Sequence, residues 1–142
     1  VESSGLSIWI GAQISAFGTI NLFLLLILII IVVNFLTEIA SNMATIAMVL
    51  PILAAVALEF DLHPYILMVA ASVSASCAFM LPVATPPNAV VFGSGFLTIP
   101  DMVKKGFLLN LASIIIIALM IYYVLPLIWG FVPDKFPKEL IP

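Results

Sequence analysis

The stretch that decides the fold is LPVATPPNA, residues 81–89, because it interrupts an otherwise apolar run. Three prolines fall within six residues, and proline cannot continue a regular helix. Apolar character leads up to this stretch over residues 65–81 and resumes over residues 89–95. The pattern predicts two helical segments separated by a break at residues 82–88.

A second interruption lies upstream, where polar residues separate two other apolar runs. The runs cover residues 20–36 and 46–58. The first run, with its flanking residues, is long enough for a membrane helix at about 1.5 Å per residue. The segment between them lacks Gly, Pro and Lys, which are typical of turns and membrane anchors. Its polar residues are Thr37, Glu38, Ser41, Asn42 and Thr45.

The composition predicts an integral membrane protein. Of 142 residues, 65% are hydrophobic and only 8% are charged, whereas a soluble domain carries about 25% charged residues. The chain has four Lys and Arg and a net charge of −3, so nucleic acid is an unsuitable partner. The single cysteine, Cys77, excludes an intrachain disulfide and is expected to be a small buried thiol.

Irregular backbone at membrane depth is tolerated only where it faces protein or a water-filled cavity. Two such interruptions in one short chain suggest a shared cavity, the way secondary transporters build their sites. Ser41 and Asn42 offer neutral hydrogen-bonding groups to a carboxylate, and Glu38 is expected to cap or brace this same polar segment by accepting backbone hydrogen bonds. The alternatives are an extramembrane turn at the first interruption and a proline kink without a ligand at the second.

Further segments frame these two interruptions. Residues 1–16 are expected to form an interfacial arm or a connector, and we expect further sequence before Val1. His63 is expected to be a solvated loop residue, with no metal-ligand pattern around it. Lys104 and Lys105 favour a cytoplasmic position before the last apolar helix, which would leave the C-terminus outside.

Two motifs carry a resemblance to a known family. Ser41–Asn42 with Ala44–Thr45, followed by the proline stretch at residues 81–89, resembles the divalent anion:sodium symporters. That family includes bacterial dicarboxylate carriers and animal citrate and dicarboxylate carriers. Residues 74–80 match as well, and the similarity extends from about residue 34 to residue 130.

The resemblance implies an all-α integral membrane fold, the second inverted repeat of a secondary transporter. The repeat would contain a re-entrant helical hairpin at residues 17–60 and a discontinuous transmembrane helix at 64–96. A last transmembrane helix at 101–130 and an extramembrane tail at 131–142 would follow. Within these units, the helices would cover residues 20–40, 43–58, 65–81, 89–95 and 107–129.

The resemblance also implies roles for single residues. Ser41 and Asn42 would contact a substrate carboxylate, and Thr85 and Pro86 would line the pocket. Met43 replaces the threonine of the strict family motif, so it would contribute only its backbone N–H. Sodium would be the bound co-substrate, with no organic cofactor. Its ligands would be the carbonyls of Thr37, Ala40, Pro82 and Ala84 and the side chain of Asn42.

The expected function is sodium-coupled transport of a C4-type dicarboxylate by an elevator-like mechanism in the plasma (inner) membrane. The expected partners are the dicarboxylate anion, membrane lipid, an N-terminal half of the same transporter and a second copy in a homodimer. A dicarboxylate exchanger or a sulfate or citrate carrier of the same fold is the alternative within transport. A non-transporting membrane interaction subunit is the alternative outside it. The sequence contains no recognisable nucleophile–base pair that would indicate an enzyme.

Overall fold

The computed structural model describes residues 21–137, within which all regular structure is helical. This agrees with the all-α prediction. The predicted arm at residues 1–16 lies outside the described residues. The elements are α2 (Leu22–Leu36), α3 (Asn42–Glu59), α4 (Pro64–Ala75), α5 (Pro86–Gly93), α6 (Ile99–Leu119), η2 (Met120–Val124) and α7 (Leu125–Trp129).

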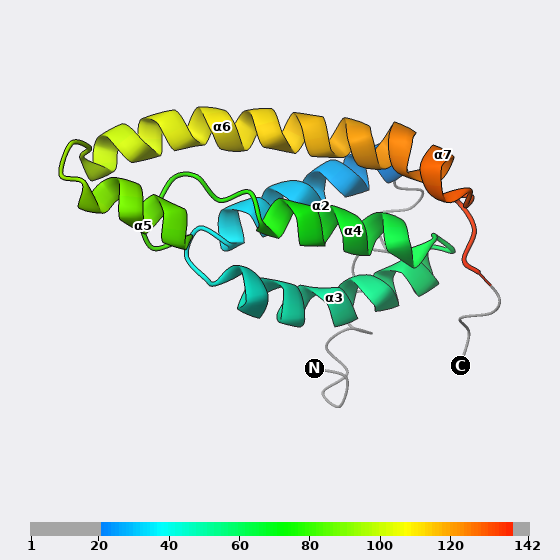
Figure 1. Ribbon diagram of the computed structural model, residues 1–142. Helices are drawn as coiled ribbons and strands as arrows, with labels where there is room; N and C mark the ends of the chain where they lie inside the picture. Colours follow the sequence, from blue (N-terminus) through cyan, green and yellow to red (C-terminus); the bar gives the residue numbers. More distant parts are fainter. Residues whose placement is uncertain (1–20, 138–142) are drawn as a thin grey trace.

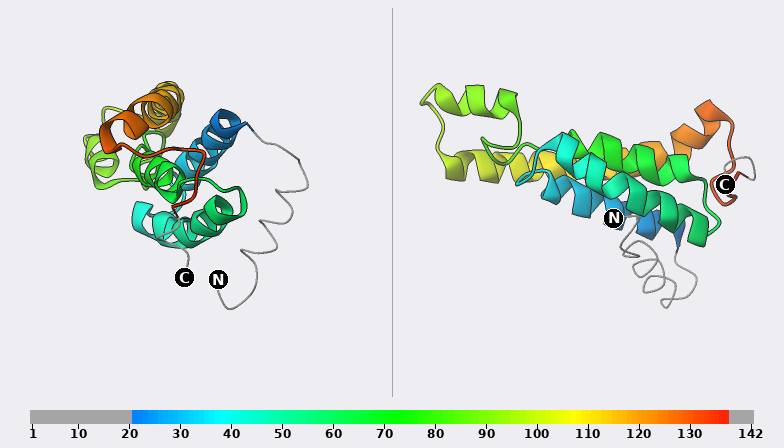
Figure 2. Two further views of the ribbon diagram at one scale, coloured as in Figure 1. Left: turned by 90° about the vertical axis from the view of Figure 1, so that its right-hand side faces the viewer. Right: turned by 90° about the horizontal axis from the view of Figure 1, so that it is seen from below.

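Helix α4 lies at the centre of the bundle, with α2, α3 and α6 arranged around it (Figures 1 and 2). α2 and α3 pack mainly on α4 and touch each other little. The core consists of apolar side chains from these helices, and α4 contributes small residues that allow close packing. Fully buried members include Leu26, Ile30, Ile66, Leu67 and Ala70.

The α2–α3 connection, residues 37–41, is short and irregular. α2 ends at Leu36, four residues earlier than the predicted helix end at residue 40. α3 begins at Asn42 because Ser41, in extended conformation, accepts a hydrogen bond from the N–H of Ala44. Pro51 lies inside α3 without ending it.

The α4–α5 connection, residues 76–85, corrects the predicted position of the break. α4 ends at Ala75, so residues 76–81, predicted as helix, are non-helical. Pro86 and Pro87, predicted as part of the break, instead form the first turn of α5. Proline is favourable there because its fixed φ suits a helix start, and the first N–H groups of a helix have no helical partner.

The last helical run extends from α6 through η2 to α7. Thr98 and Asp101 form a capping box at its start, so the helix begins at Ile99, eight residues before the predicted residue 107. A π-helical turn precedes Pro126, which has no N–H for the carbonyl one turn earlier. By length and composition, α3 and the run Ile99–Trp129 are the two described helices that could cross a membrane.

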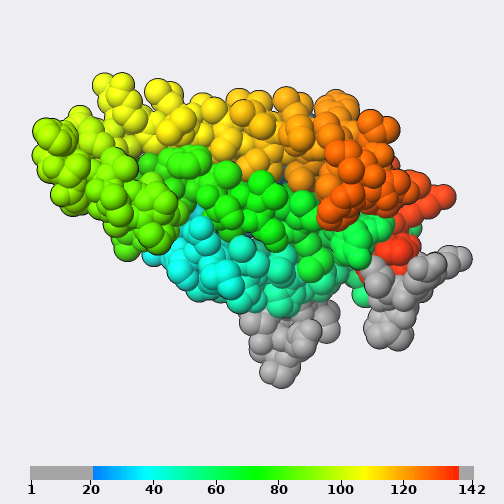
Figure 3. Space-filling model, viewed as in Figure 1, coloured from blue at the N-terminus to red at the C-terminus, as the bar shows by residue number. Residues whose placement is uncertain are grey.

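One end of the bundle is closed by aromatic residues. His63 caps α4, and its ring stacks on Phe131 with centroids 4.3 Å apart. The N–H of His63 donates to the carbonyl of Pro133 at 2.9 Å, which joins the α3–α4 connection to the segment after α7. His63 is therefore half-buried and structural rather than a solvated loop residue, and this burial lowers its pKa. α5 and the start of α6 project at the opposite end (Figure 3).

Candidate functional site

Glu38 joins the two irregular connections. Its carboxylate is 4% exposed. It accepts hydrogen bonds from the backbone N–H groups of Phe79 (2.8 Å), Met80 (3.0 and 3.1 Å) and Leu81 (3.0 Å). Successive N–H groups that converge on one anion neutralise part of its charge without a cation. The predicted bracing role of Glu38 is confirmed, although the backbone that it braces belongs to the α4–α5 connection.

Helix α6 completes the environment of Glu38. The Nδ2 atom of Asn110, a fully buried residue, donates to Glu38 Oε1 at 2.7 Å, and its Oδ1 accepts from the N–H of Phe79 at 3.2 Å. One turn earlier, Gly106 packs against the same backbone. A Cβ atom at Gly106 would overlap the carbonyl of Phe79 and lie 2.6 Å from Cα of Met80. Only glycine therefore fits without a shift of the connection.

Side chains of the α2–α3 region also satisfy carbonyls at the end of α4. Asn34 Nδ2 donates to the carbonyl of Cys77 at 2.6 Å. The hydroxyl of Thr37 lies 2.9 Å from the carbonyl of Ala75 and 2.6 Å from Asn42 Oδ1. It has a single proton, so it can donate to only one of them at a time. Thr37 and Asn42, two of the predicted sodium ligands, are thus in direct contact.

Asn88 holds the α4–α5 connection from its other side. Its Nδ2 group donates to the carbonyls of Ala78 (2.9 Å) and Leu81 (3.0 Å). Six polar backbone groups of residues 77–81 are therefore bonded by the side chains of Asn34, Glu38, Asn88 and Asn110. An amide or carboxylate side chain here replaces the hydrogen bonds that a helix would make, which explains why the chain can leave helical geometry before the prolines.

The start of α3 presents free donors. Ser41 caps Ala44, whereas the N–H groups of Asn42 and Met43 have no acceptor among residues 21–137. The positive end of the helix dipole lies at the same place, which favours a bound anion. The side chain of Met43 is 78% exposed and makes no polar contact.

The start of α5 has the same capping pattern but no free donors. Thr85 caps the N–H of Asn88 at 3.4 Å, and the two intervening residues, Pro86 and Pro87, have no N–H. Pro86 can contribute its ring and the dipole of α5, but no backbone hydrogen bond. The predicted pocket residues at the two helix starts thus differ in what they can donate.

Four carbonyl oxygens were predicted as sodium ligands. Those of Thr37, Ala40, Pro82 and Ala84 accept no hydrogen bond from any residue that the structure describes. Carbonyl oxygens suit a hard cation such as sodium. The contacts between Glu38 and residues 79–81 bring the connections that carry these two pairs together. No cluster of His, Cys, Asp and Glu that could hold a metal occurs within residues 21–137.

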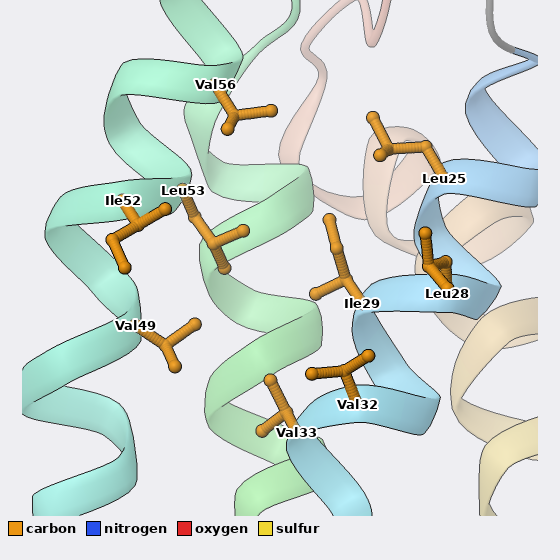
Figure 4. Close-up of a pocket in the computed structure, with 9 residues that line it drawn as sticks. All are labelled: Leu25, Leu28, Ile29, Val32, Val33, Val49, Ile52, Leu53 and Val56. Atoms are coloured by element: carbon orange, nitrogen blue, oxygen red, sulfur yellow. The ribbon is translucent and has the colours of Figure 1, made fainter. Parts of the chain in front are cut away.

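Three cavities in the described part of the bundle lie elsewhere and are apolar. The groove between α2 and α3 has a volume of about 230 Å³ and is lined by aliphatic side chains only (Figure 4). Its walls include Leu28, Ile29, Val32, Val49 and Ile52. A dianion would lose its hydration there without gaining a hydrogen bond, so the groove is excluded as a carboxylate site.

Sequence reasoning did not assign a role to Asn34, Asn88, Gly106 or Asn110. Asn34 and Asn110 are polar residues inside apolar runs, which is a signal that sequence alone provides. Gly106 and Asn110 are four residues apart, so they share one face of a helix. The identity of their partners required the three-dimensional structure, because Asn110 and Glu38 are 72 positions apart.

The comparisons with known proteins agree with the resemblance drawn from the motifs. A family model described as the sodium:sulfate symporter transmembrane region matches residues 1–130. The sodium-dependent dicarboxylate transporter SdcS of Staphylococcus saprophyticus is 45% identical over 130 residues, which cover 92% of this chain and 25% of that protein. SdcS of Staphylococcus aureus strain USA300 is 48% identical over the same shares.

This chain spans about a quarter of the length of the curated relatives it matches. The family description and the relatives' names are those of transporters and not of enzymes. They confirm the predicted resemblance to the divalent anion:sodium symporters and the prediction that the chain is not an enzyme.

Proposed function

The chain belongs to the sodium:sulfate symporter family, and we propose that it forms part of a sodium-coupled transporter of a C4-type dicarboxylate such as succinate. Membership in a family defined by its transmembrane region, together with two helices able to cross a membrane, makes it part of an integral membrane protein. The observation that carries the proposal is the set of hydrogen bonds from the N–H groups of residues 79–81 to the carboxylate of Glu38. These bonds join the α2–α3 and α4–α5 connections into one candidate site.

We assign the dicarboxylate to the start of α3. A substrate carboxylate there would accept hydrogen bonds from the free N–H groups of Asn42 and Met43 and from the hydroxyl of Ser41. Thr85 and Pro86 would line the opposite wall. The aliphatic groove between α2 and α3 offers no such donors, which favours the polar end of the hairpin.

Sodium would bind between the two connections. The carbonyls of Thr37, Ala40, Pro82 and Ala84 are free of described hydrogen bonds, and Asn42 Oδ1 lies beside Thr37. Asn42 would therefore contribute its side chain to the cation and its N–H to the substrate. This double role explains how binding of one ligand would favour binding of the other.

The proposed membrane arrangement is a re-entrant hairpin beside a helix in two halves. α2 has 15 residues and a length of about 22 Å, less than a hydrocarbon core of about 30 Å. α5 and the start of α6 project beyond the α2–α3 connection (Figure 1). Both observations support a hairpin whose end stops inside the membrane, with α3, at 18 residues, as its longer arm. α4 and α5, with 12 and 8 residues, together have the length of one span, about 30 Å.

The remaining features of the proposal concern the complete protein. The hairpin and the divided helix would carry the ligands by an elevator-like movement against a scaffold formed by a homodimer in the plasma (inner) membrane. An N-terminal half of the same transporter would supply the other wall of the site. Lipid would cover the outward apolar faces.

The test uses the complete protein that carries this sequence, reconstituted in liposomes. Asn42→Ala should lower the apparent affinities for sodium and succinate together, each by about tenfold, because one side chain serves both ligands. Asn21→Ala, which removes only the exposed cap of α2, is the control. A fall in succinate affinity with unchanged sodium dependence would contradict the shared role. An absence of uptake by the unmodified protein would favour the non-transporting subunit.

The depth of the hairpin has its own test. In a re-entrant hairpin, the new thiol of an Ala44→Cys variant should react slowly with an impermeant thiol reagent, and sodium should slow this reaction further. Asp134→Cys, in the segment after α7, gives the rate for an exposed site. Equal rates at the two positions, unaffected by sodium, would identify residues 37–41 as an ordinary extramembrane turn.

Sulfate is a second candidate substrate, because the family is described by sodium:sulfate symport. Both anions carry two negative charges, but sulfate is shorter and would engage the start of α3 alone. Competition of sulfate and succinate against labelled succinate in the same liposomes separates the two. Stronger inhibition by sulfate would reassign the substrate and leave the site unchanged.

A further inference from the structure

We propose that Asn110, on α6, is a positioning residue for the sodium site, acting through Glu38 and the backbone of residues 79–81. The inference rests on the proposed function. Asn110 touches neither of the proposed ligands, and no motif of the sequence assigns it a role. Its side chain is fully buried, and both ends of the amide are used at the same place.

The first step is the orientation of Glu38. Its carboxylate receives hydrogen bonds from four uncharged donors, and Asn110 Nδ2 is the one donor that is a side chain. The three backbone donors belong to the connection that must be positioned, so they cannot fix Glu38 independently of it. Asn110 does so from a regular helix, which is the more rigid reference.

The second step is the placement of the connection. Asn110 Oδ1 accepts the N–H of Phe79, and Gly106, one turn away on α6, lies against the carbonyl of Phe79 and Cα of Met80. The connection is therefore held by one face of α6, through the hydrogen bond to Asn110 and through direct contact with Gly106. A change at either α6 residue must move residues 79–81.

The third step leads to the cation. The N–H of Ala84 donates to the carbonyl of Leu81 at 3.2 Å, which closes a turn over Pro82 and Val83. The proposed ligands, the carbonyls of Pro82 and Ala84, are thus tied to Leu81, whose own N–H is held by Glu38 at 3.0 Å. A displacement of Glu38 and Asn110 would therefore also displace the carbonyls of Pro82 and Ala84, because both lie in the turn that follows Leu81.

The fourth step is electrostatic. The proposed sodium ligands are all uncharged, and the carboxylate of Glu38 follows Thr37, one of them, directly in the sequence. In surroundings of low dielectric constant, a negative charge on the residue next to a ligand favours a cation without coordinating it. Asn110 keeps that charge buried and oriented, so its loss should weaken sodium binding more than substrate binding.

The experiment exchanges the carboxylate of Glu38 and the amide of Asn110 in the complete protein. Glu38→Gln places an amide beside the amide of Asn110, and Asn110→Asp places a carboxylate beside that of Glu38. The double variant Glu38→Gln/Asn110→Asp restores one amide and one carboxylate to the pair. Uptake is measured against sodium at saturating succinate and against succinate at saturating sodium, and thermal unfolding of each purified variant is followed in detergent.

The proposal expects each single variant to raise the sodium concentration for half-maximal uptake by about tenfold. The succinate dependence should change by less than about threefold, and the double variant should recover most of the loss. Ser113→Ala, which removes a hydroxyl bonded to the carbonyl of Asn110, is the matched control on α6. Equal shifts for sodium and succinate, or a double variant no better in sodium dependence and stability than the single variants, would overturn it.

A second pair of variants tests the same inference without altering charge. Gly106→Ala should raise the sodium requirement, because its methyl group displaces residues 79 and 80. Gly93→Ala should not, since open space surrounds Gly93. Unmodified protein without sodium-dependent uptake would reject the proposed function itself. If the unmodified protein shows normal uptake, and neither Gly106→Ala nor Asn110→Asp changes its sodium dependence, only the positioning role is rejected.

Discussion

The two irregular connections use the chain in opposite ways. The α2–α3 connection and its flanks supply side chains, since Asn34, Thr37 and Glu38 all reach across to bond another backbone. The α4–α5 connection supplies the backbone, and its N–H and carbonyl groups are bonded from outside. The two connections are therefore complementary, because side chains of the first bond backbone groups of the second that would otherwise lack partners.

The helix starts that follow the two connections differ as well. α3 and α5 each begin after a capping hydroxyl residue, Ser41 and Thr85. The first two positions of α3 offer free N–H groups, whereas the same positions of α5 are prolines. The same capping pattern therefore produces a donor site in one helix and a wall without donors in the other.

The largest effect is expected from removal of the bridge between the connections. Glu38→Ala leaves the N–H groups of Met80 and Leu81 without an acceptor, at a cost of about 1–3 kcal/mol for each buried group. The complete protein should lose several kcal/mol of stability, with little folded material after detergent extraction. Glu59→Ala, at the exposed end of α3, is the matched control. Equal thermal stability of the two variants would show that the connections hold their shape independently.

The next largest effect should come from making the two helix starts alike. Met43→Pro gives α3 the proline that α5 has at its second position, and it removes one N–H from the proposed carboxylate site. Substrate affinity should fall by about tenfold, the worth of one hydrogen bond to a charged group. Pro87→Ala adds the corresponding N–H to α5. Pro87→Ala should leave the substrate affinity unchanged if only α3 binds the carboxylate. Uptake kinetics of the Met43→Pro and Pro87→Ala variants measure both affinities.

The smallest effect concerns the two caps. Ser41→Ala and Thr85→Ala each remove one hydrogen bond at a helix start, worth about 0.5–2 kcal/mol. The loss of stability should be greater for Ser41→Ala, because the prolines of α5 and the contacts of Asn88 hold that start without its cap. Thermal unfolding of both variants measures the difference. A greater loss at Thr85 would contradict the view that the prolines fix the start of α5.

Several features of this fold followed from the sequence. The interruption of the apolar run by prolines, the polar residues before α3 and the helical content were all predictable, because they depend on local preferences. The early end of α4 was not, since residues 76–81 carry no residue that breaks a helix. They leave the helix because Glu38, Asn34 and Asn110 bond their backbone, and these partners are far away in the sequence.

The candidate site was predictable in part for the same reason. Glu38 was recognisable as a brace, since an unpaired acid inside an apolar chain needs donors. Which donors it would use could not be read from spacing. Gly106 and Asn110 were recognisable as neighbours on one helix face, but their role depends on what packs against that face.

The aromatic end of the bundle has a mechanical consequence. At Gly130, in left-handed conformation, the chain turns back, and Pro133 and Phe136 are hydrogen-bonded to His63 and Asp61. This clasp makes the start of α4 and the end of α7 move as one piece. The opposite end has no comparable clasp in the described residues, and Gly95, at positive φ, has open space around it. The clasp therefore ties the start of α4 to the segment after α7, whereas α5 is tied to the α4–α5 connection through the side chain of Asn88.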